Sequence, residues 1–511
     1  GYMSDLVNSF SSNFVSIVEK NTDSTMLIDC KSGSKFSYSD VDIKIKSCML
    51  LLTSHLPSGK TQSILSLLPN SIETLIIFFS VSLSDSTYAP CHELSSIEEV
   101  KDWVSIVKPT LCVVPRGLKY EIEEYLNSES IPIIFVSTGD HLSWMGYDES
   151  LIKYSSKGSK LLLKTSGTTG SPKAMCLNIN TLWSSANSFV RHNGAIDEKL
   201  RYYNFLPMSY LGGLFNLGLI PLVKGGSIVI DESFSAKTYF KFWKIVEKYK
   251  ISILWLVPTI INGLLSLVKN ANKKAYDNRV KLCLVGTAPI KLADKELFER
   301  EFGIPVRENY GLSETTFISS ENLSESYGAR NEGSVGNILP YVDLKLVPIE
   351  NSRPDISKKF NILVKTPFLF DGYLSADGSI NKALALDADN YFRTGDIGII
   401  EGNRLSIIGR SKDIIKKGGN FVSLREIELV VEKNKHVLES AAVSIPHSFY
   451  GESVLLYIVL NSPESACINQ EIYSWLGDHV SKYKMPDKII IKEKFPKTTS
   501  GKIMKIALQD C

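Results

Sequence analysis

The stretch that decides the fold is KLLLKTSGTTGSPK, residues 160–173. Leu161, Leu162 and Leu163 form an apolar run of the length of a buried strand, and a loop rich in glycine and hydroxyl groups follows it. Glycines let backbone N–H groups approach an anion, hydroxyls add donors, and a lysine adds positive charge. The loop is typical of a phosphate site or of a polar surface turn. Its candidate phosphate ligands are Thr165, Ser166, Gly167, Thr168, Thr169, Gly170 and Lys173.

This loop is not a Walker A loop, because the GxxxxGK[ST] pattern does not fit it. A second glycine–lysine pair, Gly501-Lys502, is followed by Ile503 where that pattern requires serine or threonine. The fold of the P-loop nucleotide hydrolases therefore loses support.

Length and composition predict a globular protein of two or more domains. The chain has 511 residues, of which 44% are hydrophobic, too many for one typical core. With 57 basic and 55 acidic residues the net charge is +2, so no overall field favours nucleic acid or an anionic membrane. Residues 75–83 are the most apolar stretch and are too short to span a bilayer.

The eight cysteines are scattered, without a CxxC pair, which disfavours a zinc site or a disulfide framework. A reducing cytoplasm fits this usage best. No signal peptide is expected. Gly1 and Tyr2, which precede Met3, are interpreted as the remnant of an expression tag.

Apolar runs of strand length alternate with stretches of helix length through the first three hundred or so residues. Residues 37–55 have helical spacing with Ser39 and Asp40 as candidate caps, and residues 64–68, 72–83 and 87–89 predict a βαβ unit. Further strands are expected at 110–114, 131–136, 203–206, 227–230, 251–257 and 281–285. The fold class is therefore α/β, with stacked, largely parallel sheets and helices on their faces.

Ligands bind such sheets at the carboxyl ends of the strands. The loops expected there include residues 165–173, 207–213, 258–259, 286–289 and 309–314. After Gly333 shorter strands and turns predict a β-rich subdomain. The charged stretch 409–420 then leads to about a hundred final residues, enough for a small domain. The expected division is 1–410 and 411–511.

Seven short motifs stand in order along the chain: TSGTTGSPK (165–173), GTAP (286–289), NYGLSE (309–314), GSVG (333–336), YFRTGD (391–396), GRSKDIIKKGG (409–419) and PKTTSGK (496–502). Each motif alone could be an ordinary turn, but the probability that all seven occur in this order and spacing by chance is very small. Over residues from about 25 to 505 the sequence resembles the AMP-forming acyl- and aryl-acid ligases, the superfamily of acyl-CoA synthetases, peptide-synthetase adenylation domains and firefly luciferase.

The resemblance implies that a substrate carboxylate attacks the α-phosphate of ATP, giving an acyl adenylate and pyrophosphate. Such catalysis is mainly positioning and charge stabilisation. Asp396 would accept hydrogen bonds from the ribose hydroxyls, and Glu314 would bind Mg²⁺. Thr165, Glu314 and Lys502 are the implied catalytic residues. The other implied nucleotide ligands are Gly286, Thr287, Ala288, Asn309, Tyr310, Gly311, Ser313 and Arg410.

The same resemblance implies a mobile C-terminal domain. Lys502, the implied adenylation lysine, would reach the active site by closure of that domain about a hinge at Lys412. In the alternate orientation Gly418 and Gly419 would line a channel for a pantetheine thiol. Phe421 and Leu424 stand where the family often has Asn and Pro after this loop. The resemblance therefore does not determine the surface that binds the thiol acceptor.

The gate segment of the family is PMSYLGG here, residues 207–213. Amino-acid-activating members commonly carry an aspartate there for the α-ammonium, and no aspartate occurs between Pro207 and Val229. An uncharged fatty or aryl carboxylic acid is therefore favoured, because an unpaired buried ammonium is costly. The expected acyl pocket, in which small glycines leave volume and apolar side chains form walls, consists of Tyr210, Leu211, Gly212, Gly213 and Leu312.

Three hypotheses stay open. The first is an acid–thiol ligase that uses CoA, and the second performs the same adenylation but loads a carrier-protein phosphopantetheine, with an amino acid among its possible substrates. The third is a non-catalytic or luciferase-like relative. A degenerate binder is expected to lose Lys502, Glu314 or Asp396, and all three are present.

Overall fold

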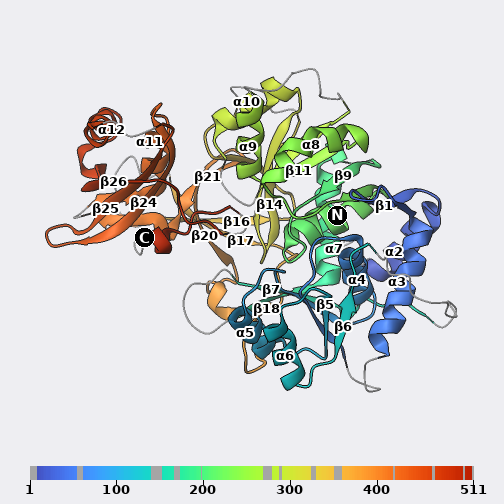
Figure 1. Cartoon of the computed structure of the whole chain (residues 1–511). Coiled ribbons are helices and arrows are strands. Elements are labelled where there is room, and N and C mark those ends of the chain that lie inside the picture. Colours follow the sequence, from blue (N-terminus) through green and yellow to red (C-terminus); the bar gives the residue numbers. More distant parts are fainter. Residues whose placement is uncertain are drawn as a thin grey trace.

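The structure is a computed structural model of the chain. It describes residues 9–54, 61–139, 152–165, 173–196, 198–268, 279–286, 290–323, 330–349, 359–417, 420–462, 466–498 and 501–508. A large α/β part is joined to a smaller C-terminal part, which lies to the left in Figure 1. None of the described helices combines the length and apolar character that crossing a membrane requires.

The described helices of four residues or more, other than η3 (Gly212–Leu219), are α2 (Phe10–Lys20), α3 (Tyr38–Thr53), α4 (Ile72–Ser82), α5 (Ile97–Val107), α6 (Tyr120–Ser128), α7 (Ile179–His192), α8 (Ala236–Lys248), α9 (Pro258–Val268), α10 (Leu292–Phe302), α11 (Leu424–Val431), α12 (Ile468–Gly477) and α13 (Lys505–Leu508). The segment η3 winds as a π-helix.

The first sheet has eight strands in the order β19-β18-β8-β7-β4-β3-β5-β6. The strands from β7 to β6 pair in parallel, and β8, β18 and β19 continue the sheet in antiparallel pairs. The strands are β3 (Ser63–Ser66), β4 (Thr87–Pro90), β5 (Leu111–Pro115), β6 (Ile133–Val136), β7 (Lys160–Lys164), β8 (Ala174–Asn178), β18 (Gly372–Leu374) and β19 (Ile380–Asn381).

The second sheet has thirteen strands in the order β16-β17-β20-β21-β15-β14-β13-β12-β11-β9-β10-β1-β2. In this spatial order, the neighbours from β13 through β12, β11, β9 and β10 to β1 pair in parallel. The neighbours from β16 to β13, and the edge strand β2 with β1, pair antiparallel. The strands are β1 (Thr25–Asp29), β2 (Lys35–Ser37), β9 (Arg201–Asn204), β10 (Ser227–Ile230), β11 (Ile253–Leu256), β12 (Leu282–Val285), β13 (Val306–Leu312), β14 (Thr316–Ser320), β15 (Ser334–Ile338), β16 (Asp343–Pro348), β17 (Phe360–Lys365), β20 (Phe392–Glu401) and β21 (Arg404–Arg410).

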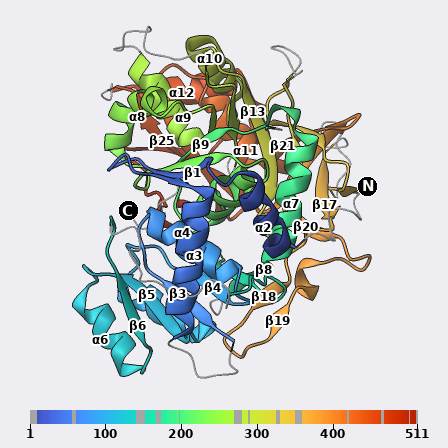
Figure 2. The same ribbon diagram turned by 90° about the vertical axis from the view of Figure 1, so that its right-hand side faces the viewer.

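Helices α3, α4 and α7 lie between the two sheets, as Figure 2 shows for α3 and α4. All eleven residues of α4 are buried, because this helix contacts β4 of one sheet and β1 of the other. The sequence of α4 is almost entirely apolar but too short to span a bilayer. The helix is instead part of the core of a layered α/β fold. The outer face of the eight-stranded sheet packs on α5 and α6.

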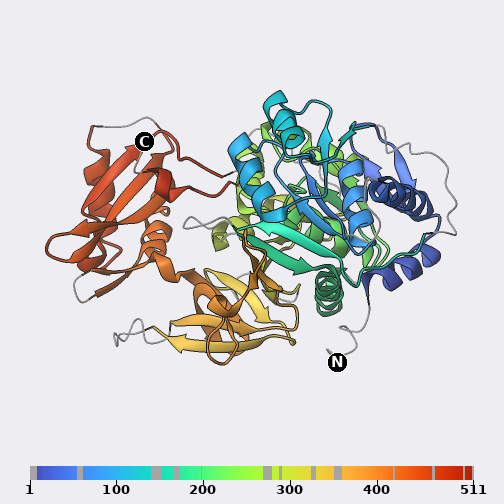
Figure 3. The same cartoon turned by 90° about the horizontal axis from the view of Figure 1, so that it is seen from below.

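Figure 3 places the yellow and orange strands of the β-rich part between the red C-terminal part and the parallel strands. The C-terminal part has a separate sheet, β23-β22-β25-β24, with β26 paired in parallel to β25. It encloses its own apolar clusters. Its strands are β22 (Ile414–Lys417), β23 (Asn420–Ser423), β24 (Val437–His447), β25 (Gly451–Leu460) and β26 (Lys488–Lys492).

The α/β class is confirmed, and several local predictions need correction. The cap of α3 is Ser37 rather than Ser39, and Asp40 forms the other half of a capping box with it. The strand expected at 203–206 begins earlier, at Arg201. Residues Asn309 to Leu312 were expected in a loop, but β13 runs through them because it changes partner there, from parallel β12 to antiparallel β14.

Candidate functional site

The most developed polar cluster lies around Asp396. The β20–β21 hairpin pairs Asp396 directly opposite Arg410, and the Nη1 atom of Arg410 is 3.6 Å from a carboxylate oxygen of Asp396. The hydroxyl of Tyr310 donates to the other oxygen at 2.5 Å. Asp396 is 5% exposed, whereas the Arg410 side chain is 46% exposed. The motifs YFRTGD, GRSKDIIKKGG and NYGLSE therefore meet at one buried carboxylate.

Burial raises the pKa of Asp396, while the Tyr310 hydrogen bond and the positive charge of Arg410 oppose the rise. Burial and the neighbouring carboxylate hold the pKa of Tyr310 well above its ordinary value. Tyr310 is therefore a hydrogen-bond donor at neutral pH. The carboxylate keeps acceptor capacity for further donors such as the two hydroxyls of a ribose.

A buried donor lies next to this cluster on the same strand. Asn309 is 7% exposed, and its Nδ2 atom has no hydrogen-bond partner among the described residues. Its Oδ1 atom would lie 2.6 Å from a Cβ added at Gly286, so a larger residue after β12 would displace the amide. An unsatisfied buried amide costs about 1–3 kcal/mol. The amide is suited to a planar ligand with hydrogen-bond acceptors at its edge.

Glu314 follows β13 in a tight turn. The hydroxyl of Tyr373 donates to its Oε2 atom at 3.1 Å, and its backbone oxygen accepts from the N–H of Phe370 at 2.8 Å. Burial raises the pKa of Glu314, and the Tyr373 hydrogen bond and the charge of Arg410 oppose that rise. A half-buried carboxylate with an acceptor oxygen to spare suits a hard cation that takes one or two carboxylates and completes its shell with phosphates and water. Groups of three or more metal-ligating side chains are absent from the described part of the chain.

The PKTTSGK turn reaches this region from the C-terminal part. The backbone N–H of Thr498 donates to the oxygen of Lys502 at 2.8 Å, and Lys497 and Ile503 form an isolated bridge, so the turn is a small hairpin. Gly501 has a φ of +86°, and a Cβ added there would lie 2.8 Å from the hydroxyl of Thr259 at the start of α9. The turn is therefore seated on the edge where β11 ends.

Lys502, in this turn, feels the charges of the Asp396 cluster. Desolvation lowers the pKa of Lys502, and the charges of Arg410 and Lys412 lower it further, while the charge of Asp396 opposes them. These charges can act on Lys502 only if the C-terminal part brings it close to Arg410. The side chain keeps access to solvent, so its ammonium is available to a ligand.

The phosphate-loop motif starts between two antiparallel strands, β7 and β8. Thr165 donates through its N–H to the backbone oxygen of Lys173 at 3.3 Å, and Lys173 itself is exposed. The other predicted ligands of this motif, together with two of the GTAP motif, lie outside the described residues: Ser166, Gly167, Thr168, Thr169, Gly170, Thr287 and Ala288.

The predicted gate segment lies after β9. Tyr210 is 40% exposed, and its pKa is raised by burial first and then by Cys91 and Glu99, which follow β4. Tyr210 therefore stands where the carboxyl ends of both sheets approach each other. Leu211 and Leu312 pack on the main apolar core.

The glycines of this region lie close to neighbouring atoms. A Cβ at Gly213 would lie 2.5 Å from the backbone oxygen of Pro207, one at Gly212 would meet Leu206, and one at Gly311 would lie 2.0 Å from the oxygen of Thr316. Backbone oxygens therefore lie beside Gly213 and Gly311, and the Leu206 side chain lies beside Gly212. The place of Gly212 and Gly213 in an acyl pocket stays a prediction.

Comparison with known families agrees with this arrangement. The family model described as "AMP-binding enzyme" matches residues 14–374, and the model described as "AMP-binding enzyme C-terminal domain" matches residues 426–502. The chain belongs to the AMP-binding enzyme family. The resemblance drawn from the seven motifs is thereby confirmed.

Individual relatives of this AMP-binding enzyme are CoA ligases by name. An oxalate–CoA ligase from Saccharomyces cerevisiae is 26% identical over 470 residues, covering 85% of this chain and 84% of the relative. A sulfoacetate–CoA ligase from Cupriavidus necator is 30% identical over 351 residues, covering 68% of this chain and 66% of the relative. The crystal structure of ATP-bound MatB from Rhodopseudomonas palustris matches with a TM-score of 0.83 at 22% identity, covering 97% and 98% of the two chains. The fold is shared throughout.

The chain of the AMP-binding enzyme passes from the thirteen-stranded sheet to the C-terminal sheet through the short helix η7 (Ser411–Asp413). Lys412, the expected hinge, lies in this helix and is exposed. The expected thiol-channel residues Gly418 and Gly419 lie outside the described residues.

Two residues at the site escaped sequence reasoning. Tyr373 is 59 positions from Glu314, and Thr259 is far along the chain from Gly501; no local pattern joins either pair. Both contacts are made by tertiary folding alone. Ser313, by contrast, lies in the predicted turn before Glu314, but its role as a nucleotide ligand stays a prediction.

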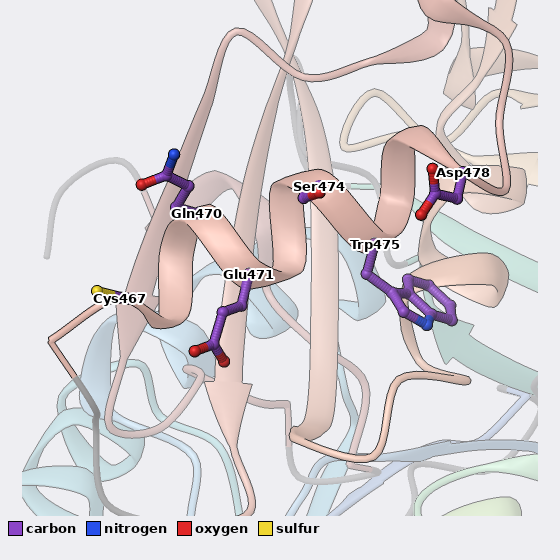
Figure 4. A pocket seen from close by; sticks show the side chains of 6 residues that line it. All are labelled: Cys467, Gln470, Glu471, Ser474, Trp475 and Asp478. Carbon is purple, nitrogen blue, oxygen red and sulfur yellow. The ribbon is translucent and has the colours of Figure 1, made fainter.

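A hollow on the outward side of α12 is unrelated to this site. Figure 4 shows its six lining residues, all on or beside that one helix: Cys467, Gln470, Glu471, Ser474, Trp475 and Asp478. Because one helix supplies the whole lining, the hollow is open surface without converging groups.

Proposed function

We propose that the chain is an ATP-dependent acid–CoA ligase, which converts a carboxylic acid first to an acyl adenylate and then to a CoA thioester. The observation that carries the proposal is the seat of the PKTTSGK turn on Thr259, at the edge where β11 ends. This seat brings the turn that carries Lys502 against the large part of the molecule. A nucleotide bound at Asp396 would thus meet the lysine of the other domain. The domain boundary is proposed at η7, dividing the chain into 1–410 and 411–511.

In the first step a carboxylate oxygen of the acid forms a bond to the α-phosphorus of ATP, and the bond from that phosphorus to the pyrophosphate oxygen breaks. Asp396 holds the ribose hydroxyls, and Asn309 donates its unpaired Nδ2 hydrogen to the base. Lys502 stabilises the negative charge that develops around the α-phosphate. Thr165 and the following loop bind the leaving phosphates.

Glu314 would hold Mg²⁺ together with phosphate oxygens, and the metal, when bound, would supply charge neutralisation to the phosphates. Replacing Glu314 with glutamine removes that negative charge. We expect pyrophosphate release by Glu314→Gln to require a higher magnesium concentration, whereas Tyr373→Phe, which removes only the supporting hydroxyl, keeps the ordinary magnesium dependence. An unaltered magnesium titration for Glu314→Gln would reject this role.

In the second step the sulfur of the CoA pantetheine forms a bond to the acyl carbon, AMP leaves with the oxygen that joined it to the acyl group, and the thiol proton passes to solvent. Rotation about Lys412 would withdraw Lys502 and bring Gly418 and Gly419 toward the adenylate. A carrier-protein pantetheine is the alternative acceptor, and competition between CoA and a carrier protein for the adenylate distinguishes the two.

The acid proposed from the sequence is an uncharged fatty or aryl acid. A second candidate class, short acids with another acidic group, is favoured by the oxalate and sulfoacetate relatives. A panel tests both: ATP–pyrophosphate exchange with matched fatty, aryl, dicarboxylic and α-amino acids. We expect an acid without an ammonium to exceed its α-amino analogue about a hundredfold in catalytic efficiency.

A better rate with the amino acid would overturn the pocket assignment. Absence of exchange with every acid would favour the non-catalytic alternative, whereas exchange without CoA transfer would favour the luciferase-like one. The cytoplasmic location stays a prediction.

A further inference from the structure

An ion pair crosses the boundary between the two parts of the molecule. Lys291, the N-cap residue of α10, has its Nζ atom 3.4 Å from Oε2 of Glu432, the C-cap residue of α11. The Glu432 side chain is 11% exposed and that of Lys291 is 33% exposed. The two residues lie on opposite sides of η7 in the sequence, so any rotation about η7 changes the distance between them.

Burial makes Glu432 depend on its partner. Burial raises the pKa of Glu432, the positive charges of Lys291 and Arg425 oppose the rise, and Glu428 adds to it. Arg425 and Glu428 form an ion pair of their own within α11, at 3.4 Å, and stay with Glu432 when the domain turns. Lys291, which belongs to the large part, is the charge that Glu432 would lose when the C-terminal part turns.

The other end of the pair stands on a rigid mount. Lys295, one helical turn after Lys291, is 1% exposed, and its Nζ atom bonds Glu308 at 2.9 Å and Glu321 at 3.0 Å. Glu308 directly precedes Asn309 on β13. The first turn of α10 is therefore fixed to the strand that carries the proposed base ligand, and a group held at Lys291 is held relative to the nucleotide.

We propose that the Lys291–Glu432 ion pair is a latch that holds the C-terminal domain in the orientation presenting Lys502. Both are thus positioning residues for acyl-adenylate formation, an inference that rests on the proposed function. The latch and the seat of Gly501 on Thr259 form together in this orientation. Breaking the pair shifts the population of orientations without touching a group that contacts substrate.

The test is charge reversal with rescue. Glu432→Lys places like charges together and is expected to slow acid-dependent ATP–pyrophosphate exchange about three- to tenfold, mainly through kcat, while CoA transfer from supplied acyl adenylate stays within about twofold. Adding Lys291→Glu restores the pair in reverse and is expected to recover the exchange rate. The acid is the best substrate in the panel above, and the adenylate is made from it.

Lys345→Glu is the matched control. Lys345 is also 33% exposed and pairs with Asp387 at 2.6 Å, but both partners lie in the large domain. Its reversal is expected to leave the ratio of the two half-reactions unchanged. Equal loss in both half-reactions for Glu432→Lys, no recovery in the double variant, or the same ratio change in Lys345→Glu would overturn the latch.

A second readout needs no substrate. Backbone hydrogen exchange of the free chain at Thr498 and Gly501, whose N–H groups are hydrogen-bonded in the turn seated on Thr259, is expected to be faster in Glu432→Lys and to return in the double variant. If no acid supports exchange of pyrophosphate, the proposed function fails, and hydrogen exchange alone then decides the latch. Backbone hydrogen exchange at the same rate in all variants would overturn the latch.

Discussion

At the scale of single residues, the role proposed for Lys502 distinguishes the two half-reactions. We expect Lys502→Ala to slow acyl-adenylate formation about a hundredfold or more, which is the size of losing one preorganised electrostatic donor. CoA transfer from a supplied adenylate should be largely spared, because the lysine acts on the α-phosphate only. The measurement is single-turnover kinetics of each step, with Lys482→Ala, an exposed lysine of η8 (Lys482–Lys484), as control. Equal losses in both steps would contradict the assignment.

Asp396 gives the site a pH dependence whose sign follows from its burial. Because the pKa of Asp396 is raised, its carboxylate is lost at a higher pH than that of an exposed aspartate, whose pKa is about 3.9. Ribose hydroxyls need the ionised acceptor, so AMP affinity should be full above the raised pKa and fall as pH decreases through it. Folding stability responds in the opposite direction, because the folded state binds this proton more tightly than the unfolded chain.

The variants Tyr310→Phe and Asp396→Asn test this dependence by calorimetric titration with AMP. Tyr310→Phe removes a hydrogen bond that lowers the pKa, so the loss of affinity should move to higher pH. Asp396→Asn should bind weakly without that step. A midpoint at or below the value of an exposed aspartate would show that burial does not control this group.

At the scale of elements, a buried ion network fastens α10 to the sheet. Lys295 bonds Glu308 of β13 and Glu321, which follows β14, and all three residues are at most 4% exposed. Replacing Lys295 leaves the buried carboxylates of Glu308 and Glu321 without the positive charge that they share. We expect Lys295→Met to lower the free energy of unfolding by about 3–5 kcal/mol, as measured by urea denaturation of the large domain.

The comparison is Lys345→Met, which breaks a more exposed pair and should cost at most about 1 kcal/mol. Similar losses for the two variants would mean that burial of the network matters little. Burial raises the pKa of Glu308 to about 7, because desolvation outweighs the charge of Lys295.

At the scale of the whole molecule, η7 is the joint between two separately packed parts. We expect Lys412→Pro, which fixes one backbone dihedral of the joint, to slow CoA transfer at least tenfold more than adenylate formation. Lys412→Ala leaves the backbone free and should spare both steps. Rates of the two half-reactions measure the effect, and equal slowing of both by the proline would place the hinge elsewhere.

The sequence by itself determined the α/β class and the family. Both depend on local features, namely the alternation of apolar runs and the order of seven motifs, and each survives any small error in element boundaries. The pairing of Asp396 with Arg410 was not predicted from the sequence, although one hairpin, β20–β21, makes it. The turn fixes the register near Glu401 and Arg404, but a bulge between Ile397 and Gly398 shifts it by one residue before Asp396, so the turn alone does not set this pair.

Only the tertiary structure decided what surrounds these residues. The hydroxyl of Tyr373 on Glu314, the seat of Gly501 on Thr259 and the pair of Lys291 with Glu432 each join segments that are distant in sequence. The close approach of the Pro207 backbone oxygen to Gly213 is likewise a tertiary contact. Burial, and with it the pKa of Asp396 and the need for a partner at Glu432, depends on packing by the whole chain, because desolvation depends on every neighbouring atom rather than on sequence neighbours.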